Sequence, residues 1–132
     1  MFKNKINYWK IYTIMKTLVV GASTNPERYS FIAANMLKSY GHEIILLGKK
    51  EGEVAGSQIE TNQKQFEEID TITMYVGAKH QPELYDYLLE LKPRRIIFNP
   101  GTENPVFEEK AQQAGIAVEE ACTLVLLSTH QY

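Results

Sequence analysis

Short apolar runs alternate along this chain with helical segments of about ten residues. The runs occupy residues 17–20, 43–47, 71–76, 95–98 and 116–118, and a weaker one lies within 56–61. Consecutive apolar positions are typical of strands in a sheet that helices cover on both faces. Strands and helices that alternate in this way form βαβ units with right-handed crossovers. The sequence therefore predicts an α/β domain with a Rossmann-like fold, with a parallel sheet of about five to six strands and helices on both faces.

The helical segments have recognisable ends and apolar stripes. Residues 28–40 are expected to form a helix with a broad apolar stripe at Ile32, Met36 and Tyr40, with Ala33 and Leu37 beside them. Pro82 is expected at the first position of the next helix. Asn104 is expected to cap a third helix in which Phe107, Ala111 and Ala114 face inward. The apolar tail 121–127 fits either a helix or a strand.

The chain has room for one domain. With 132 residues it is expected to hold a single core, formed by residues 16–132. Residues 1–15 form an N-terminal extension that is basic and aromatic and has no clear periodicity. Two interpretations of these residues remain open: either they are an upstream extension or a misassigned start, or they form an arm that packs on a partner subunit. The second interpretation admits a homodimer.

Charge and composition exclude several classes of protein. Residues 1–16 carry four lysines and no acid, whereas the remainder carries ten basic and sixteen acidic residues. An acidic body argues against a general nucleic-acid binder, which neutralises many phosphates. No apolar run approaches the roughly 18 residues that span a membrane, and the single cysteine, Cys122, has no partner for an internal disulfide. We therefore expect a cytoplasmic protein.

Polar loops follow the predicted strands, at the edge where parallel sheets bind ligands. The first loop, residues 21–30, begins with Gly21 and leads to a helix N-terminus, which favours an anion. Arg28, expected in the first helical turn, is placed to pair with a diphosphate. The loop lacks the second and third glycines of a G-x-G-x-x-G motif, so an ordinary polar turn is the alternative.

The second loop distinguishes between nucleotide ligands. Dinucleotide sites for NAD place an acid after the second strand to hold the ribose hydroxyls. This chain has Gly48, Lys49 and Lys50 there instead. Basic residues at this position suit a phosphorylated ribose, as in NADP or coenzyme A (CoA), and a solvated charge pair is the alternative.

Residues that could carry catalysis are few. His42, His80 and His130 fall on separate elements without metal-ligand spacing. Cys122 has no histidine beside it and is expected to be a buried hydrophobic residue that thiol reagents label slowly. We expect neither a metal site nor catalytic residues.

Four segments together resemble the small CoA-binding proteins of bacteria, which are similar to the N-terminal CoA-binding domain of the succinyl-CoA synthetase α subunit. The segments are L-V-V-G-A-S-T-N-P-E-R-Y-S (18–30), the glycine–lysine loop (48–52), R-I-I-F-N-P-G-T-E-N-P (95–105) and the pair A-G-I-A-V and A-C-T-L-V-L-L within 114–127. The resemblance covers residues 16–132. It implies that the domain binds CoA or an acyl-CoA as a stand-alone module without catalysis of its own.

The resemblance also implies site residues, one loop at a time. The CoA diphosphate would lie at Gly21, Ala22, Ser23, Thr24, Asn25, Arg28 and Ser30. Gly48, Lys49 and Lys50 would contact CoA after the second strand, and Val76 and Gly77 would lie against the adenine. The loop 99–104, with Asn99, Pro100 and Gly101, would face the pantetheine.

Two departures from the family pattern keep other functions open. The usual P-V-N-P at the end of the second strand is replaced by L-L-G-K-K (46–50), which affects recognition of the adenosine. The phosphohistidine domain of the synthetase is absent, so its ligase reaction does not follow. The alternatives are a minimal NADP-binding enzyme or redox sensor, and an interaction domain that has lost its ligand.

Overall fold

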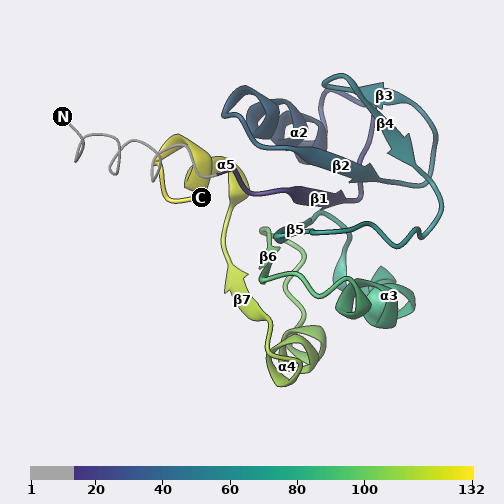
Figure 1. Cartoon of the computed structure of the whole chain (residues 1–132), viewed down its shortest axis with the longest axis vertical. Helices are drawn as coiled ribbons and strands as arrows, with labels where there is room; N and C mark the ends of the chain where they lie inside the picture. Colours follow the sequence, from purple (N-terminus) through teal and green to yellow (C-terminus); the bar gives the residue numbers. More distant parts are fainter. Residues whose placement is uncertain (1–13) are drawn as a thin grey trace.

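A seven-stranded sheet forms the centre of the molecule, with the strand order β3-β4-β2-β1-β5-β6-β7. The computed structural model describes residues 14–132, so the predicted N-terminal extension lies almost entirely outside the described residues. The strands are β1 (Thr17–Val20), β2 (Ile44–Leu47), β3 (Glu53–Val54), β4 (Ser57–Glu60), β5 (Thr71–Met74), β6 (Arg95–Phe98) and β7 (Ala117–Glu120). Every pair is parallel except β3 with β4. Figure 1 shows the twisted sheet edge-on between two layers of helices.

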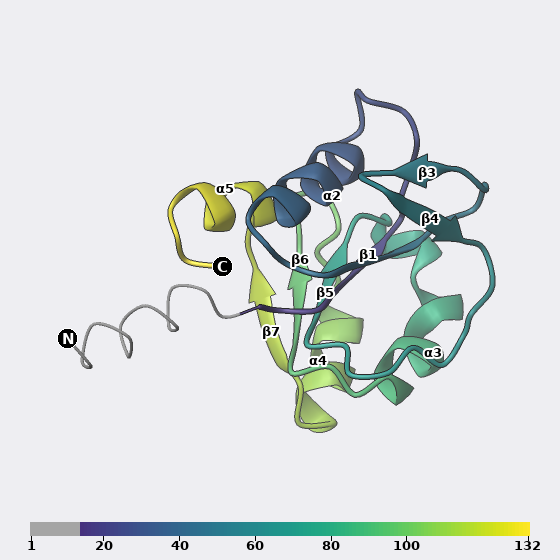
Figure 2. The same ribbon diagram turned by 45° about the horizontal axis from the view of Figure 1, so that its top comes forward.

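Two helices lie on each side of the sheet. They are α2 (Tyr29–Ser39), α3 (Tyr85–Glu90), α4 (Pro105–Gln113) and α5 (Thr123–Ser128). Figures 1 and 2 place α2 and α5 against one face and α3 and α4 against the other. The α/β fold with helices on both faces is therefore confirmed.

Alternation along the strands divides the core into two layers. Val19 and Leu46 pack toward α2 and α5, where they meet Leu37 and Leu127. The neighbouring positions point the other way, and the opposite cluster is larger: Leu18, Val20, Ile72, Met74, Ile96 and Phe98 with Leu88 and Phe107. Period-two alternation with both faces covered is the physical reason that the strands are apolar at consecutive positions.

The sheet is mostly parallel, as predicted, and has one strand more than the five to six expected. The weak segment within 56–61 is strand β4, and β3 precedes it as an antiparallel edge strand of two residues. Ala55 and Gly56 between them have φ of 53° and 79°, which is typical of the tight turns that join hairpin strands. A strand of two residues is too short to leave a periodic pattern in the sequence.

Helix α2 turns only one side of its predicted broad apolar stripe to the sheet: Ala33 and Leu37 are buried as expected, whereas Ile32, Met36 and Tyr40 are not fully buried. Its buried residues are Ser30, Ala33, Ala34 and Leu37. Tyr40 is 44% exposed, and Ile32 and Met36 are half-buried. Small residues let the helix lie close to the sheet, so the larger apolar side chains are left on its outer surface.

The other helices also differ in detail from the predictions. Pro82 begins a 3-10 turn (Pro82–Leu84), and the helix α3 starts after it. Asn104 caps α4 by accepting a hydrogen bond from the N–H of Phe107, as predicted. Phe107 and Ala111 are buried as expected, but Ala114 is exposed. The tail forms the helix α5. Among residues 14–132, no helix is long and apolar enough to cross a membrane.

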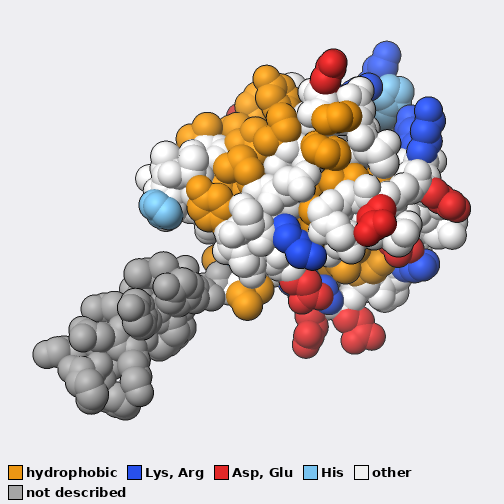
Figure 3. Space-filling view, turned by 90° about the horizontal axis from the view of Figure 1, so that it is seen from above, with side chains coloured by type: hydrophobic (Ala, Val, Ile, Leu, Met, Phe, Trp, Pro, Cys, Tyr) orange, Lys and Arg blue, Asp and Glu red, His pale blue; other side chains and the backbone are white. Residues whose placement is uncertain are grey.

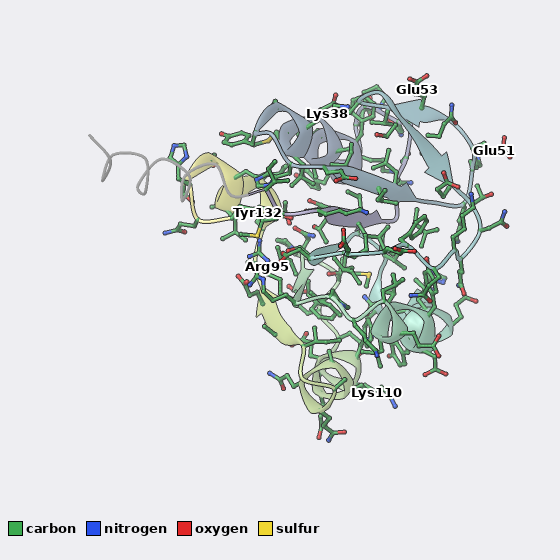
Figure 4. All side chains as sticks on the ribbon, in the orientation of Figure 1. Lys38, Glu51, Glu53, Arg95, Lys110 and Tyr132 are labelled. Atoms are coloured by element: carbon green, nitrogen blue, oxygen red, sulfur yellow. The ribbon has the colours of Figure 1, made fainter. Side chains whose placement is uncertain are left out.

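A buried arginine joins the strands at the amino edge of the sheet. Arg95 is 4% exposed, donates to Thr71 Oγ1 at 2.9 Å and pairs with Glu119 at 3.0 Å. Its guanidinium lies 4.4 Å from the centroid of the Tyr132 ring, and Figure 4 shows the two side chains next to each other. The Tyr132 ring also packs edge-on against His42 at 4.9 Å. Through these contacts Tyr132 packs against the amino edge of the sheet, which is the edge opposite the polar loops.

Candidate functional site

The topology places the predicted site at the carboxyl edge of the sheet. The chain runs outward from β1 through β2 to β4 and then returns to β5 on the other side of β1. Parallel sheets bind ligands at such a reversal, beyond the carboxyl ends of the two central strands. The loops after β1 and β5 border the reversal, with the β2 loop on one side and the β6 loop on the other.

The loops after β1 and β5 are in direct contact. Gly21 has φ of 98°, and a Cβ on it would lie 3.0 Å from the carbonyl carbon and oxygen of Tyr75 and 3.1 Å from Cγ2 of Val76. Only glycine fits this backbone conformation and this spacing. The structure thus brings together Gly21 and Val76, two residues assigned to the site from different loops.

The loops after β1 and β2 lock together in the same way. The backbone N–H groups of Gly21 and Ala22 both donate to the carbonyl oxygen of Leu47, each at 2.9 Å. A Cβ on Gly48 would lie 2.5 Å from the carbonyl oxygen of Ala22, and one on Gly52 would lie 2.4 Å from Cγ2 of Thr24. The first two predicted loops therefore form one continuous surface.

The N-terminus of α2 faces this surface without a side-chain cap. Arg28 is the cap residue rather than part of the first helical turn, and its side chain makes no capping hydrogen bond. Hydrogen bonds between residues close in sequence fix the loop before it. The N–H of Asn25 donates to Ser23 Oγ at 3.0 Å, and the N–H of Glu27 donates to Asn25 Oδ1 at 2.9 Å. The arrangement can receive an anion at the helix N-terminus. Ser30 is only 4% exposed and belongs to the buried face of α2.

Positive side chains flank the surface without acidic partners. Arg28, Lys49 and Lys50 are all exposed, and none of the four ion pairs found among residues 14–132 involves them. Glu51, labelled in Figure 4, follows the two lysines in the same loop and is also exposed. The three cations are therefore free to meet an anionic ligand.

Asn99 holds the strands together at this edge, and its amide is fully occupied. Its Nδ2 donates to Thr73 Oγ1 at 2.7 Å and to the carbonyl oxygen of Met74 at 2.9 Å. Its Oδ1 accepts from the N–H of Thr123 at 2.8 Å. Pro100 and Gly101 beyond it are exposed, as is Gly77 after β5.

Gln81 is a residue of this edge that the sequence did not reveal. It is fully buried, and its Nε2 donates to the carbonyl oxygens of Val76 at 2.8 Å and Thr102 at 2.9 Å. Its Oε1 accepts from Asn104 Nδ2 at 2.9 Å. The side chain thereby ties the β5 loop to the β6 loop, a role with no local sequence signal.

A pocket of about 220 Å³ lies beside the loops, between the N-terminal ends of α2 and α5. Residues from four segments line it: Tyr29, Tyr75, Asn99, Pro100, Cys122 and Leu124. The expected burial of Cys122 was wrong, since this residue is partly exposed and forms part of the wall. Tyr29, Tyr75 and Leu124 were not predicted, because only the tertiary fold brings them together.

The described residues offer binding groups but no evident catalytic group. Within residues 14–132, no three His, Cys, Asp or Glu side chains gather in a way that could hold a metal ion. What the edge supplies is a helix N-terminus, three cations and a small pocket. This combination defines a Rossmann-like protein with a site suited to an elongated anionic ligand.

Comparison with known proteins identifies the family. A family model described as a CoA binding domain matches residues 15–128, so the chain belongs to the CoA-binding domain family. An uncharacterised protein of known crystal structure is 45% identical, with a TM-score of 0.89, over 91% of this chain and 99% of its own.

More distant structures share the fold. A protein from Thermus thermophilus is 17% identical with a TM-score of 0.81, covering 97% of this chain and 98% of its own. A hypothetical protein from Pyrococcus horikoshii OT3 is 21% identical with a TM-score of 0.82, covering 97% and 92%. No curated protein matches the chain significantly.

Proposed function

We propose that this domain binds CoA or an acyl-CoA at the carboxyl edge of the sheet and acts as a binding module without catalysis of its own. The observation that carries the proposal is the N-terminus of α2, which has no side-chain cap, lies next to interlocked glycine loops and is flanked by cations that form no ion pair within residues 14–132. The family match supports CoA as the ligand. A cytoplasmic location, where CoA is plentiful and a lone cysteine stays reduced, belongs to the same proposal.

Each loop takes one part of the ligand in this proposal. The diphosphate binds at the start of α2, on Arg28 and on the loop residues Gly21, Ala22, Ser23, Thr24 and Asn25. The 3′-phosphate of the ribose meets Lys49 and Lys50, next to Gly48. The adenine lies against Val76 and Gly77, and the pantetheine runs along Pro100 and Gly101. Ser30 and Asn99 support the loops from inside, since both are buried.

A panel of ligands distinguishes the proposed CoA site from an NADP site, since the ribose of NADP also carries a phosphate. Isothermal titration calorimetry would compare CoA, dephospho-CoA, NADP and NAD. We expect CoA to bind most tightly, and dephospho-CoA about tenfold or more weakly, because a charge-assisted contact contributes roughly 1.5–3 kcal/mol. Equal affinity for CoA and dephospho-CoA would remove the lysines from the site, and preferential binding of NADP would contradict the proposed function.

We also propose that a second copy of the chain covers the face formed by α2 and α5. Tyr29 is 69% exposed and Val125 54%, and a groove of about 470 Å³ runs along α2, lined by Pro26, Phe31, Ile32, Asn35, Met36 and Ser39. Figure 3 views the molecule from this side and shows apolar side chains gathered on it. Lys38 is the one charged residue of the two helices.

The absence of charge is the reason to choose a second copy as the occupant. Residues 17–132 carry sixteen acidic and ten basic side chains, so most orientations of two copies bring like charges together. A two-fold contact through α2 and α5 places the same uncharged surface on both sides. Large exposed apolar patches commonly mark such interfaces.

A further inference from the structure

The strand order fixes where the sulfur end of a bound CoA must lie. In CoA the phosphorylated ribose and the thiol stand at opposite ends, with the diphosphate between them. In the sheet, the β2 loop with its lysines and the β6 loop lie on opposite sides of the β1 loop. A ligand with its 3′-phosphate at Lys49 and Lys50 and its diphosphate at α2 therefore extends its sulfur toward β6 and α5.

The pocket lined by Tyr29, Tyr75, Asn99, Pro100, Cys122 and Leu124 lies on this path. Tyr29 directly follows Arg28 at the start of α2, and the backbone of Tyr75 touches Gly21. Cys122 and Leu124 come from the start of α5, beside β6. The pocket thus continues the proposed diphosphate site in the direction of the sulfur.

The chemistry of the wall selects what the pocket can hold. None of the six lining residues is charged, and the amide of Asn99 is already occupied by Thr73, Met74 and Thr123. The polar groups left on the wall are the phenol hydroxyls of Tyr29 and Tyr75, and that of Tyr75 has no hydrogen-bond partner among the described residues. A carboxylate placed there would lose its hydration without meeting a positive charge, which is costly. The volume of about 220 Å³ is below the roughly 300–1,000 Å³ of sites that enclose a whole drug-sized ligand.

We propose that this pocket receives a short, uncharged acyl group carried on the sulfur of CoA. The inference rests on the proposed function and specifies its ligand class. The acyl chain packs between Tyr29, Tyr75 and Leu124 and covers the thiol of Cys122. The domain thereby prefers short-chain acyl-CoA to CoA itself and to acyl-CoA with a terminal carboxylate.

Calorimetric titration with CoA and with acetyl-, propionyl-, butyryl- and succinyl-CoA tests the preference. We expect the affinity to rise about fourfold with each methylene until the pocket is full, because a buried methylene contributes about 0.8 kcal/mol. Butyryl- and succinyl-CoA both carry four-carbon chains, and succinyl-CoA should bind at least about tenfold more weakly because its carboxylate meets no cation in the pocket wall.

The outcomes separate this inference from the proposed function. Tight CoA binding with equal affinity along the acyl series, or with succinyl-CoA preferred, would overturn the acyl pocket and leave the CoA site standing. Failure of every CoA compound to bind would contradict the proposed function itself.

A matched pair of variants and the thiol of Cys122 locate the acyl group. Leu124→Trp fills the pocket, so the ratio of the CoA and butyryl-CoA dissociation constants should fall to about one, whereas Val106→Trp on the exposed surface of α4 should leave that ratio unchanged. Butyryl-CoA should also slow the reaction of Cys122 with iodoacetamide more than desulfo-CoA does, because only butyryl-CoA has an acyl group that covers the thiol. Neither compound carries a free thiol that would itself react with iodoacetamide. Equal protection by the two compounds, or an unchanged ratio in Leu124→Trp, would place the acyl group elsewhere.

Discussion

At the scale of single residues, the binding edge separates side chains that face the ligand from those that build its support. Arg28, Lys49 and Lys50 are exposed and unpaired among residues 14–132. Asn99 and Gln81 are buried and have their polar atoms bonded inside the protein. Substitutions in the first group should therefore change affinity, and substitutions in the second group should change stability.

Arg28→Ala should weaken CoA binding and leave the apo protein as stable as before. A charge-assisted contact with the diphosphate contributes roughly 1.5–3 kcal/mol, so the dissociation constant should rise about tenfold or more. The side chain is exposed and does not cap α2, and such surface changes usually alter stability by less than about 0.5 kcal/mol.

Calorimetry and thermal unfolding of the apo protein check both halves of this prediction. Glu27→Ala is the matched control, because it removes an exposed charge of opposite sign from the neighbouring position and should not lower affinity. A large loss of apo stability with unaltered affinity would make Arg28 a structural residue.

At the scale of elements, the edge depends on a few bonds that join strands and loops far apart in the sequence. Asn99 connects β6 to β5 and to the start of α5, and Gln81 connects the β5 loop to the β6 loop. The α5 side of the proposed acyl pocket depends on the first of these connections, because α5 and its cap residue supply Leu124 and Cys122.

Asn99→Ala should destabilise the fold, because it leaves the buried N–H of Thr123 and the hydroxyl of Thr73 without this partner. An unsatisfied buried polar group costs about 1–3 kcal/mol, and urea unfolding should show a loss of at least that size. Asn62→Ala, at an exposed position after β4, is the control and should unfold as the wild type does. An unchanged midpoint in Asn99→Ala would mean that α5 is anchored by other contacts.

The sequence predicts those elements whose signals are local. The strands follow from consecutive apolar positions, and the start of α4 follows from Asn104 and Pro105, whose capping role depends only on neighbours. The strand β3 and the link through Gln81 could not be predicted, because both depend on partners that the fold brings close. The apolar stripe of α2 was predicted correctly at Ala33 and Leu37 but extended too far, since periodicity alone does not tell which part of a broad stripe meets the sheet.

The candidate site likewise has a part with local sequence signals and a part that depends on tertiary contacts. The loop residues after β1 and β2 could be predicted, because every parallel strand leads into the ligand edge. The pocket could not be predicted, since Tyr29, Tyr75 and Leu124 meet only through the packing of α2 and α5 around β5 and β6.

At the scale of the whole molecule, the two edges of the sheet differ in structure and in proposed role. The carboxyl edge carries the loops of the proposed site, while the amino edge holds Arg95, Tyr132 and His42 in a packed cluster. The α2 and α5 side is nearly free of charge, and the opposite side carries the charged helices α3 and α4. Stability can therefore be tested at the amino edge, remote from the ligand, and assembly on the α2 and α5 side.

The amino edge should lose stability as the pH falls below 6.5. Burial and, to a smaller degree, the positive charge of Arg95 lower the pKa of His42 below 6.5, although Asp70 acts in the opposite direction. Neutral His42 accepts the N–H of Met15 through Nδ1 at 3.0 Å. The unfolded chain therefore takes up the proton first, so the contribution is present above pH 6.5 and is lost as the pH falls through the lower folded value.

Urea unfolding between pH 7.5 and 5 measures this dependence. Asn at position 42 can still accept from Met15 but does not titrate, so His42→Asn should flatten the pH dependence in this range, whereas the control His130→Asn, at an exposed residue, should not. Asp70 contributes at lower pH only, because hydrogen bonds from Arg94 and Thr71 outweigh its burial and hold its pKa below 3.8. An equal pH slope in wild type and His42→Asn would contradict the assignment.

The proposed dimer is tested by a matched pair of lysine substitutions on opposite sides of the sheet. Val125 on α5 and Val106 on α4 are 54% and 58% exposed, so neither change disturbs the core. Val125→Lys places two positive charges in a two-fold interface and should weaken association at least about tenfold, because like charges brought together at an interface cost several kcal/mol. Val106→Lys should leave association unchanged. Sedimentation equilibrium gives both dissociation constants, and a wild-type protein that stays monomeric at high concentration, or equal effects of the two substitutions, would show that no second copy covers α2 and α5.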